Sequence, residues 1–255
     1  MPWDPSQYLK FAGPRLRPAV DLLQRIDAEA PGLVYDLGAG AGNVTRLIAE
    51  RWPQARIIGV DGSAEMLAKA AEELPQLEWQ LADLAAWRPE RPPDVIYSNA
   101  ALHWLENHDR LISALFEALA PGGTLAVQMP RNFSAPSHTS MTDAALNGPW
   151  RDVLEPLLRP APVAGPDFYY GLLAGQAQRL DIWETEYLQV LEGEHPVKEF
   201  TKSTWLNPLL QALDEPQRGA FEADYTERVD RAYPRRPDGR TLFPFRRLFI
   251  VAHAA

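Results

Sequence analysis

The 255-residue sequence contains no cysteine. This absence excludes disulfide frameworks, zinc–thiolate and iron–sulfur sites, and thiol nucleophiles. The five histidines lack the spacing of metal ligands, so we expect no bound metal. No run approaches the roughly 18 apolar residues of a membrane span, and the first residues lack the pattern of a secretion signal, so we expect a cytoplasmic protein that does not enter membranes.

Positive charge is also scarce. There are 25 Lys and Arg against 34 Asp and Glu, which gives a net charge of −9. Nucleic-acid binding requires many cations to neutralise phosphates, so this balance disfavours DNA or RNA as a partner. We therefore expect a small-molecule ligand, and nothing in the composition indicates an oligomeric state.

The sequence does contain a regular alternation of apolar runs and helical patterns between residues 33 and 130. Runs typical of strands fall at 33–37, 56–61, 77–81, 95–99 and 124–129. Between them, apolar residues recur at helical spacing over 44–52, 66–74 and 111–119. This alternation predicts an α/β fold with a Rossmann-like, doubly wound sheet.

The second half of the chain is punctuated by proline. Five prolines fall between 149 and 166, which predicts loops and short helices. Strand patterns return at 181–191 and 247–252, and helical patterns at 205–213 and 215–233. The most economical arrangement is one domain with a sheet of about seven strands.

The clearest motif is the glycine loop 38–42, which reads GAGAG and follows the first predicted strand. Glycines here allow a tight turn and the close approach of a ligand to the backbone. The usual dinucleotide spacing would place glycine at position 43, which is Asn43, and Asp36 just before the loop repels a pyrophosphate. The ammonium of S-adenosylmethionine, by contrast, pairs with such an acid. A nicotinamide-dependent oxidoreductase is therefore the less favoured alternative.

Two further acids stand where neighbouring strands end. Asp61 follows the loop by about 20 residues, where a carboxylate accepts hydrogen bonds from a ribose. Asp83 follows the third strand and is placed to accept from the amine of an adenine, with Met66 and Leu84 offering apolar surface to the ring. Ligands of open α/β sheets bind at the carboxyl ends of the strands, so we expect an adenosyl ligand along this edge.

Successive motifs resemble those of the class I S-adenosylmethionine-dependent methyltransferases. They are VYDLGAGAGNVT from position 34, VDGSAEML from 60, ADL from 82, YSNAALHWL from 97 and LAPGGTLAVQMP from 119. The resemblance implies S-adenosylmethionine as cofactor, with S-adenosylhomocysteine as product, and an antiparallel last strand. It also implies that Gly38 and Gly40 line the methionine end of the cofactor, that Asn99 contacts it through its backbone, and that a segment with Tyr8 and Arg17 folds over it as a lid.

Three other segments resemble, more narrowly, those members of the class that esterify a small tricarboxylate. They are WDPSQYLKFAGPRLRPAVDLL near the start, DIWETEYLQVLEG from position 181, and AYPRRPDGRTLFPFRRLFIVA near the end. Within a single domain over 1–255, the resemblance implies N-terminal lid helices over 1–30 and a cofactor-binding half over 31–130. It then implies a Pro-rich insertion over 131–180. The sheet is completed over 181–255, with a helical cap and an Arg-rich final strand.

A carboxylate acceptor is already ionised at pH 7, so its methylation requires alignment but no general base. It does require cations, for which arginine's planar fork is suited. The candidates for substrate binding are Arg131, Arg240, Arg246 and Arg247, with Trp150 and Tyr170 as aromatic caps of the pocket. Because side chains alternate along a strand, at most one of Arg246 and Arg247 is expected to face the substrate directly.

Other functions remain open. A methyltransferase acting on a protonated oxygen or nitrogen would need a base, and His103 and Tyr97 are then the candidates. A non-catalytic sensor of an adenosyl ligand would use the same fold.

Overall fold

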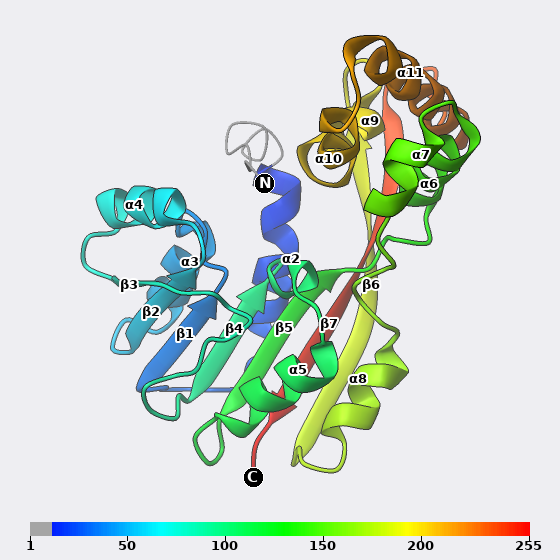
Figure 1. The fold of residues 1–255 in the computed structure, drawn as a ribbon. Coiled ribbons are helices and arrows are strands. Elements are labelled where there is room, and N and C mark those ends of the chain that lie inside the picture. The colour runs from blue at the N-terminus through cyan, green and yellow to red at the C-terminus, as the bar shows by residue number, and fades with distance from the viewer. Residues whose placement is uncertain (1–11) are drawn as a thin grey trace. The chain divides into compact units, whose positions relative to one another are not determined.

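The computed structural model describes residues 12–255, with side chains from residue 16 onward. Its strands form one seven-stranded sheet with the order β3-β2-β1-β4-β5-β7-β6 (Figure 1). They are β1 (Leu33–Leu37), β2 (Arg56–Asp61), β3 (Glu78–Leu81), β4 (Val95–Asn99), β5 (Thr124–Pro130), β6 (Arg179–Leu191) and β7 (Thr241–His253). Strands β1 to β5 are parallel to one another, whereas β7 runs antiparallel to β5. The predicted fold class is confirmed.

Helices connect and cover these strands. In the first half they are α2 (Ala12–Gln24), α3 (Asn43–Arg51), α4 (Ala64–Glu73), the 3₁₀ turn η1 (Leu102–Trp104) and α5 (His108–Glu117). In the second half they are α6 (Pro136–Asn147), α7 (Arg151–Leu154), η2 (Glu155–Leu157), α8 (Pro166–Leu173), α9 (Pro196–Thr201), the π-helical η3 (Lys202–Leu206), α10 (Asn207–Gln211) and α11 (Glu215–Ala232). None of the helices in the described part of the chain is both long and apolar enough to cross a membrane.

The central strands are apolar because both of their faces are covered. All five residues of β1 are buried, as are the first six of β5. Continuous burial of this kind is typical of parallel strands between two layers of helices. Helix α4 begins at Ala64 because Ser63 caps it, with the Ser63 hydroxyl accepting a hydrogen bond from the backbone N–H of Met66 at 3.3 Å.

Two compact units divide the chain where its side chains are described. The sheet unit comprises Leu16–Pro130, Pro162–Thr185 and Arg247–Ala255, and the helical unit comprises Arg131–Ala161 and Glu186–Arg246. Strands β6 and β7 continue from one unit into the other. Most of the predicted Pro-rich insertion and helical cap therefore belongs to one unit with its own core.

That core is aromatic at its centre. The ring of Phe200 lies 5.2 Å from that of Phe243 and 5.5 Å from that of Phe245. Trp150 and Phe221 are in edge contact, with ring centroids 5.5 Å apart. Edge-to-face contacts of this kind add to the stability gained from burial alone.

Two elements depart from the prediction. Strand β7 begins at Thr241, six residues before the predicted start at 247. The first half of the strand was not predicted because it contains Pro244, and proline is rare within strands. Helix α6 was not predicted, since the residues that it buries are mostly small or polar, with Ser137 and Ala144 beside Met141. Such a face gives little apolar periodicity to read.

Candidate functional site

The glycine loop turns sharply at the carboxyl end of β1, as predicted. Gly38 and Gly40 have φ angles of 81° and 56°, which side chains rarely adopt. A Cβ on Gly38 would lie 2.1 Å from the Cβ of Ala101, so a side chain there is sterically excluded. Around the corresponding position at Gly40, apart from its two chain neighbours, no heavy atom of the described residues lies within 4 Å. The backbone of Gly40 therefore borders open space that a ligand can enter.

Asp61, the last residue of β2, supports this loop. Its Oδ2 accepts a hydrogen bond from the backbone N–H of Gly40 at 2.8 Å, and its Oδ1 accepts one from the backbone N–H of Ser63 at 2.8 Å. Each carboxylate oxygen has a second lone pair. Asp61 thus orients the loop and keeps the capacity to accept hydrogen bonds from two hydroxyl groups.

Asp36 lies in β1 and is only 2% exposed. Its Oδ2 accepts a hydrogen bond from the hydroxyl of Thr45 at 2.6 Å. Burial raises the pKa of Asp36 to about 7, and the charge of Asp61 adds to this effect. A buried carboxylate with a raised pKa is stabilised as an anion by a nearby cation, so Asp36 favours a cationic ligand group.

The segment after β3 lies beside the loop. A methyl carbon of Leu84 is 3.9 Å from the position that a Cβ on Gly38 would take. Asp83 is exposed, and its Oδ1 accepts a hydrogen bond from the backbone N–H of Ala85 at 2.9 Å. Met66 is only 4% exposed, so among the predicted ring contacts Leu84 offers more accessible surface.

A polar cluster lies where β4, β5 and β7 meet, and consists of Asn99, His103, Gln128 and Arg247. Asn99 is opposite Gln128 in the β4–β5 ladder, and Arg247 is opposite Pro130, two residues after Gln128, in the β5–β7 ladder. Neighbours in a ladder and residues two apart share one face of a sheet. The Arg247 guanidinium donates a hydrogen bond from Nη1 to Oε1 of Gln128 at 3.2 Å, and Arg247 is only 4% exposed.

In the three uncharged side chains of this cluster, one buried polar atom each has no hydrogen-bond partner among the described residues. They are Oδ1 of Asn99, Nδ1 of His103 and Nε2 of Gln128. A buried polar atom without a partner costs about 1–3 kcal/mol, so a concentration of them indicates a place where a ligand completes the bonding. Sequence reasoning missed Gln128, although a glutamine within the apolar strand TLAVQMP was a readable signal.

Neither candidate base has the properties of a base at neutral pH. Burial, together with the charges of Arg247 and His108, lowers the pKa of His103 to about 3. The hydroxyl of Tyr97 donates a hydrogen bond to the backbone carbonyl of Ala19 at 2.8 Å, and burial raises the Tyr97 pKa well above 10. His103 is therefore a neutral hydrogen-bonding group, and Tyr97 connects β4 to α2.

The other predicted arginines lie in the helical unit. Arg246 points to the opposite face of β7 from Arg247, as predicted, and its guanidinium is 3.9 Å from a carboxylate oxygen of Glu186. Arg240 is paired with Glu192 at 3.0 Å and is about half exposed. The backbone N–H of Arg131 donates to the carbonyl of Arg246 at 2.9 Å.

The two predicted aromatic caps have other surroundings. Trp150 is 5% exposed in the core of the helical unit, and its Nε1 donates to the carbonyl of Ala144 at 2.8 Å, so it has a packing role. Tyr170 is 61% exposed on α8, and the chain after α8 is bonded to His253 through the N–H of Gln178. His253 is six residues from Arg247 along β7, or about 20 Å in an extended strand. The geometry thus gives no support to a pocket contact by either residue.

Of the predicted lid residues, Tyr8 lies outside the described residues. Arg17 is in α2, with its side chain 74% exposed and its Nε 3.9 Å from Asp21.

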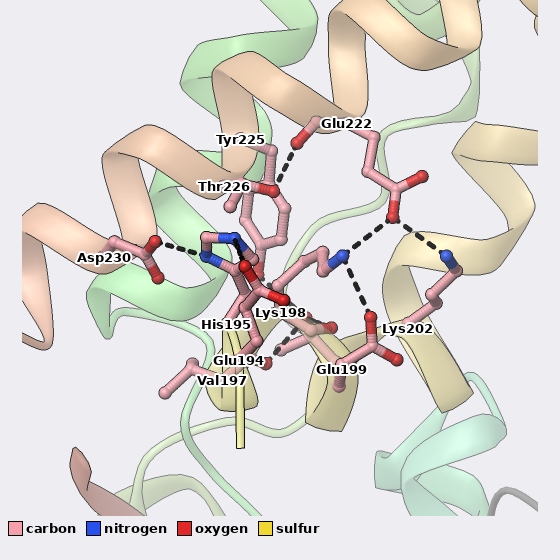
Figure 2. A network of polar contacts seen from close by, with 11 residues as sticks. Glu194, His195, Val197, Lys198, Glu199, Lys202, Glu222, Tyr225, Thr226 and Asp230 are labelled. Atoms are coloured by element: carbon pink, nitrogen blue, oxygen red, sulfur yellow. Dashed lines mark hydrogen bonds and ion pairs between the residues drawn. The ribbon is translucent and has the colours of Figure 1, made fainter. Parts of the chain in front are cut away.

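A second network of charged groups lies within the helical unit, between α9 and α11 (Figure 2). One oxygen of Glu222 accepts hydrogen bonds from Lys198 at 3.1 Å and from Lys202 at 2.9 Å. His195 is bonded to Asp230 through Nδ1 at 2.5 Å. All of them except Lys202 border an open groove. Their charges are satisfied by one another, so the network stabilises the packing of α9 on α11.

Comparison with known proteins agrees with this reading of the fold. Residues 34–123 match the family model of a methyltransferase domain. A trans-aconitate 2-methyltransferase of Azoarcus sp. (strain BH72) is 49% identical over 250 residues, which cover 98% of each chain. One of Methylobacterium radiotolerans is 45% identical over 256 residues, covering 99% of this chain and 98% of the relative. One of Yersinia pestis is 44% identical over 253 residues, again covering 99% and 98%.

Solved structures share the fold at low sequence identity. The YcgJ protein of Bacillus subtilis has a TM-score of 0.59 at 14% identity, covering 93% of this chain and 98% of its own. Phosphoethanolamine N-methyltransferase 2 of Haemonchus contortus, in complex with S-adenosyl-L-methionine, has a TM-score of 0.56 at 16% identity, covering 93% and 52%.

The sheet order, the antiparallel β7 and the glycine loop after β1 define a class I S-adenosylmethionine-dependent methyltransferase. The predicted class and cofactor are thereby confirmed. Within this class, the chain belongs to the trans-aconitate 2-methyltransferase family, because it is 44–49% identical to three members over nearly its whole length.

Proposed function

We propose that this protein transfers the methyl group of S-adenosylmethionine to a carboxylate of trans-aconitate, giving the monomethyl ester. The observation that carries the proposal is the 49% identity to the Azoarcus enzyme over 98% of both chains. Identity of this extent includes the N-terminal and Arg-rich C-terminal segments, beyond the part shared by all methyltransferase domains. The assignment of trans-aconitate as the substrate depends on these segments more than on the sheet.

The described residues fit the cofactor in three respects. The open space beside Gly40 admits a ligand to the loop backbone, and Asp61 retains lone pairs for ribose hydroxyls. The buried Asp36 and the unpartnered Oδ1 of Asn99 suit the ammonium of the methionine end. Asp83 and Leu84 follow β3, where the adenine is expected. When bound, S-adenosylmethionine supplies an electrophilic methyl group, which passes to a carboxylate oxygen as the carbon–sulfur electron pair stays on sulfur.

The protein's own contribution is positioning and the exclusion of water. A carboxylate acceptor has no proton to lose at neutral pH. This agrees with the finding that neither His103 nor Tyr97 has the properties of a general base. Holding the reactants in line contributes up to about 7–11 kcal/mol in well-oriented systems. In this proposal Tyr8 and Arg17 close over the cofactor, and arginines bind the remaining carboxylates. Arg247 is the best placed of them, because it is buried in the sheet unit.

A second candidate function is methylation of a protonated oxygen or nitrogen in another small molecule. It would need a proton acceptor, and the low pKa of His103 disfavours it. The expected cytoplasmic location stays a prediction from the sequence.

The test is turnover at neutral pH with S-adenosylmethionine and a panel of acceptors, namely trans-aconitate, cis-aconitate, citrate, isocitrate and a fatty acid. We expect an alkali-labile methyl ester, formed fastest from trans-aconitate. Calorimetry with S-adenosylhomocysteine serves as the control for an intact cofactor site. Cofactor binding without ester from any acid would overturn the substrate assignment, and would favour a different acceptor or a sensor.

A further inference from the structure

The side-chain amide of Gln128 has a fixed orientation. A guanidinium only donates hydrogen bonds, so the atom of Gln128 that faces Arg247 must be the acceptor Oε1. The donor Nε2 therefore points away from Arg247. It is fully buried and has no partner within the described chain. A buried donor without a partner is satisfied only by an acceptor from outside the described chain, such as a ligand.

His103 presents a second polar atom of this kind, and its backbone is held firmly. The Nε2 of His108 lies 3.0 Å from the carbonyl of Leu102 and must donate to it, so its Nδ1 accepts from the hydroxyl of Tyr169 at 2.7 Å. These bonds fix the η1 turn that carries His103. Just before the turn, Ala100 has a φ of 53°. Strained backbone in a non-glycine residue persists only where surrounding structure enforces it, and it is concentrated at binding sites.

The backbone also couples the two residues. The N–H of Ala100 donates to the carbonyl of Gln128 at 2.9 Å, which joins the start of the η1 segment to β5. His103 is also close enough to Arg247 for the guanidinium charge to lower the histidine pKa. Two neutral groups able to donate and one buried cation thus lie on η1, β5 and β7, which are adjacent elements of the sheet unit. Hydrogen-bond donors around a cation form a site for an anion with several acceptor oxygens, and a carboxylate is such an anion.

We propose that Nε2 of Gln128, Nδ1 of His103 and the guanidinium of Arg247 bind one carboxylate of the acceptor, with Gln128 selecting for the ionised form. The proposal rests on the proposed function and adds to it the residues that recognise the substrate. With a carboxylate as partner, the proton of the neutral imidazole resides on Nδ1. Gln128 is then a specificity-determining residue, since its amide must donate toward the substrate while its oxygen stays bonded to Arg247.

The substitution Gln128→Glu separates this role from a structural one. A glutamate keeps the shape and the acceptor for Arg247, and gains an ion pair with it, so a merely structural Gln128 would tolerate the change. If Gln128 binds the carboxylate, the substitution replaces a hydrogen-bond donor by a negative charge directed at the substrate. We expect its Kd for trans-aconitate, measured calorimetrically in the presence of S-adenosylhomocysteine, to rise at least 100-fold. The Kd for S-adenosylhomocysteine alone should change less than threefold.

Gln80→Glu is the matched control. Gln80 lies in β3, where its Oε1 accepts from the indole of Trp87 at 3.2 Å, and a glutamate keeps that bond while adding the same charge. We expect trans-aconitate affinity within threefold of the parent protein. If Gln128→Glu does not fold, His103→Phe decides, because it fills the same buried space without a donor and should weaken trans-aconitate binding about tenfold.

The outcomes distinguish the two proposals. If the parent protein neither binds nor methylates trans-aconitate, the proposed function fails. If the parent protein does both, and the folded Gln128→Glu variant, or His103→Phe in its place, binds trans-aconitate as the parent does, the assignment of the carboxylate site is overturned while the proposed function stands.

Discussion

Arg246 and Arg247 are neighbours in β7, yet their guanidinium groups have opposite environments. The side chain of Arg246 is 45% exposed and lies 3.9 Å from Glu186. Arg247 is 4% exposed and donates to Gln128. Alternation along a strand produces this difference, and burial decides its energetic meaning. A charge in a buried site interacts far more strongly with a ligand than an exposed one that water and salt screen.

We therefore predict unequal effects of the same substitution at these two positions. Arg247→Lys keeps the charge but loses the planar fork, and should raise the KM for trans-aconitate about 30-fold, or about 2 kcal/mol. Arg246→Lys should change it less than threefold. Steady-state kinetics at saturating S-adenosylmethionine measures both. Equal effects would show that burial in β7 does not select the substrate-binding arginine.

The glycine loop offers a comparison between strain and ligand contact. Gly40 and Gly122 both have positive φ, at 56° and 74°, and at neither residue does a heavy atom of the described part of the chain, neighbours in sequence aside, lie within 4 Å of the position that a Cβ would take. Alanine at either position should lower the free energy of unfolding by about 1–2 kcal/mol, because of backbone strain alone. Only Gly40→Ala should also weaken S-adenosylhomocysteine binding, by tenfold or more.

Calorimetry on the two variants, with thermal unfolding as the measure of strain, checks this prediction. If Gly122→Ala weakened cofactor binding as much as Gly40→Ala, the loss would come from general destabilisation and not from the open space beside the loop.

The parts of the fold that could be predicted are those with strong apolar patterning. The strands over 33–37, 56–61 and 95–99 have the predicted bounds, because buried parallel strands leave continuous apolar runs. The first half of β7 was not predicted because it contains Pro244, and α6 was not predicted because the residues that it buries are mostly small.

The candidate site was predictable to the extent that it depends on local motifs. The structure places the predicted loop beside the end of β2, because the N–H of Gly40 donates to Asp61 and the N–H of Gly38 donates to the carbonyl of Val60. Gln128 was missed because its polarity within an apolar strand shows only that it needs a partner, and the partner, Arg247, lies 119 residues later in the sequence. Trp150 illustrates the converse, since sequence cannot tell an aromatic residue of a core from one that covers a pocket.

The ion-pair network of the helical unit should contribute to stability and not to cofactor binding. In Figure 2, Glu222 is the shared partner of Lys198 and Lys202. The Lys198 side chain is only 14% exposed, so Glu222→Gln removes a charge partner from a mostly buried ammonium. We predict a loss of about 1–3 kcal/mol in the free energy of unfolding, with S-adenosylhomocysteine affinity unchanged.

Glu227→Gln is the control for that change, because its pair with Arg231 is more than 70% exposed on both sides. Exposed pairs contribute at most about 0.5–1 kcal/mol. Chemical denaturation of the two variants provides the comparison. Equal losses would mean that Glu222 has no special role in packing α9 against α11.

Asp36 should make the stability of the ligand-free protein depend on pH. Its pKa is about 7 in the folded protein, above the usual value near 4 of an unfolded chain, so the folded state holds the proton more tightly. The contribution of this group to the free energy of unfolding therefore falls as the pH rises from about 4 to about 7, and is constant above that range. Asp36→Asn keeps an acceptor for Thr45 and removes the titration. We predict that the variant matches the parent protein near pH 4 and is more stable by roughly 3–4 kcal/mol at pH 8.

The same substitution should weaken S-adenosylhomocysteine binding, because the ammonium loses an anionic partner. Denaturant unfolding at several pH values, together with calorimetry at pH 8, measures both effects. A stability difference that is the same at pH 4 and pH 8 would contradict the raised pKa. Greater stability at pH 8 with unchanged ligand affinity would instead confirm the burial of the charge and remove Asp36 from the cofactor site. A buried acid that destabilises the free protein and is neutralised by its ligand is an expected compromise between stability and binding.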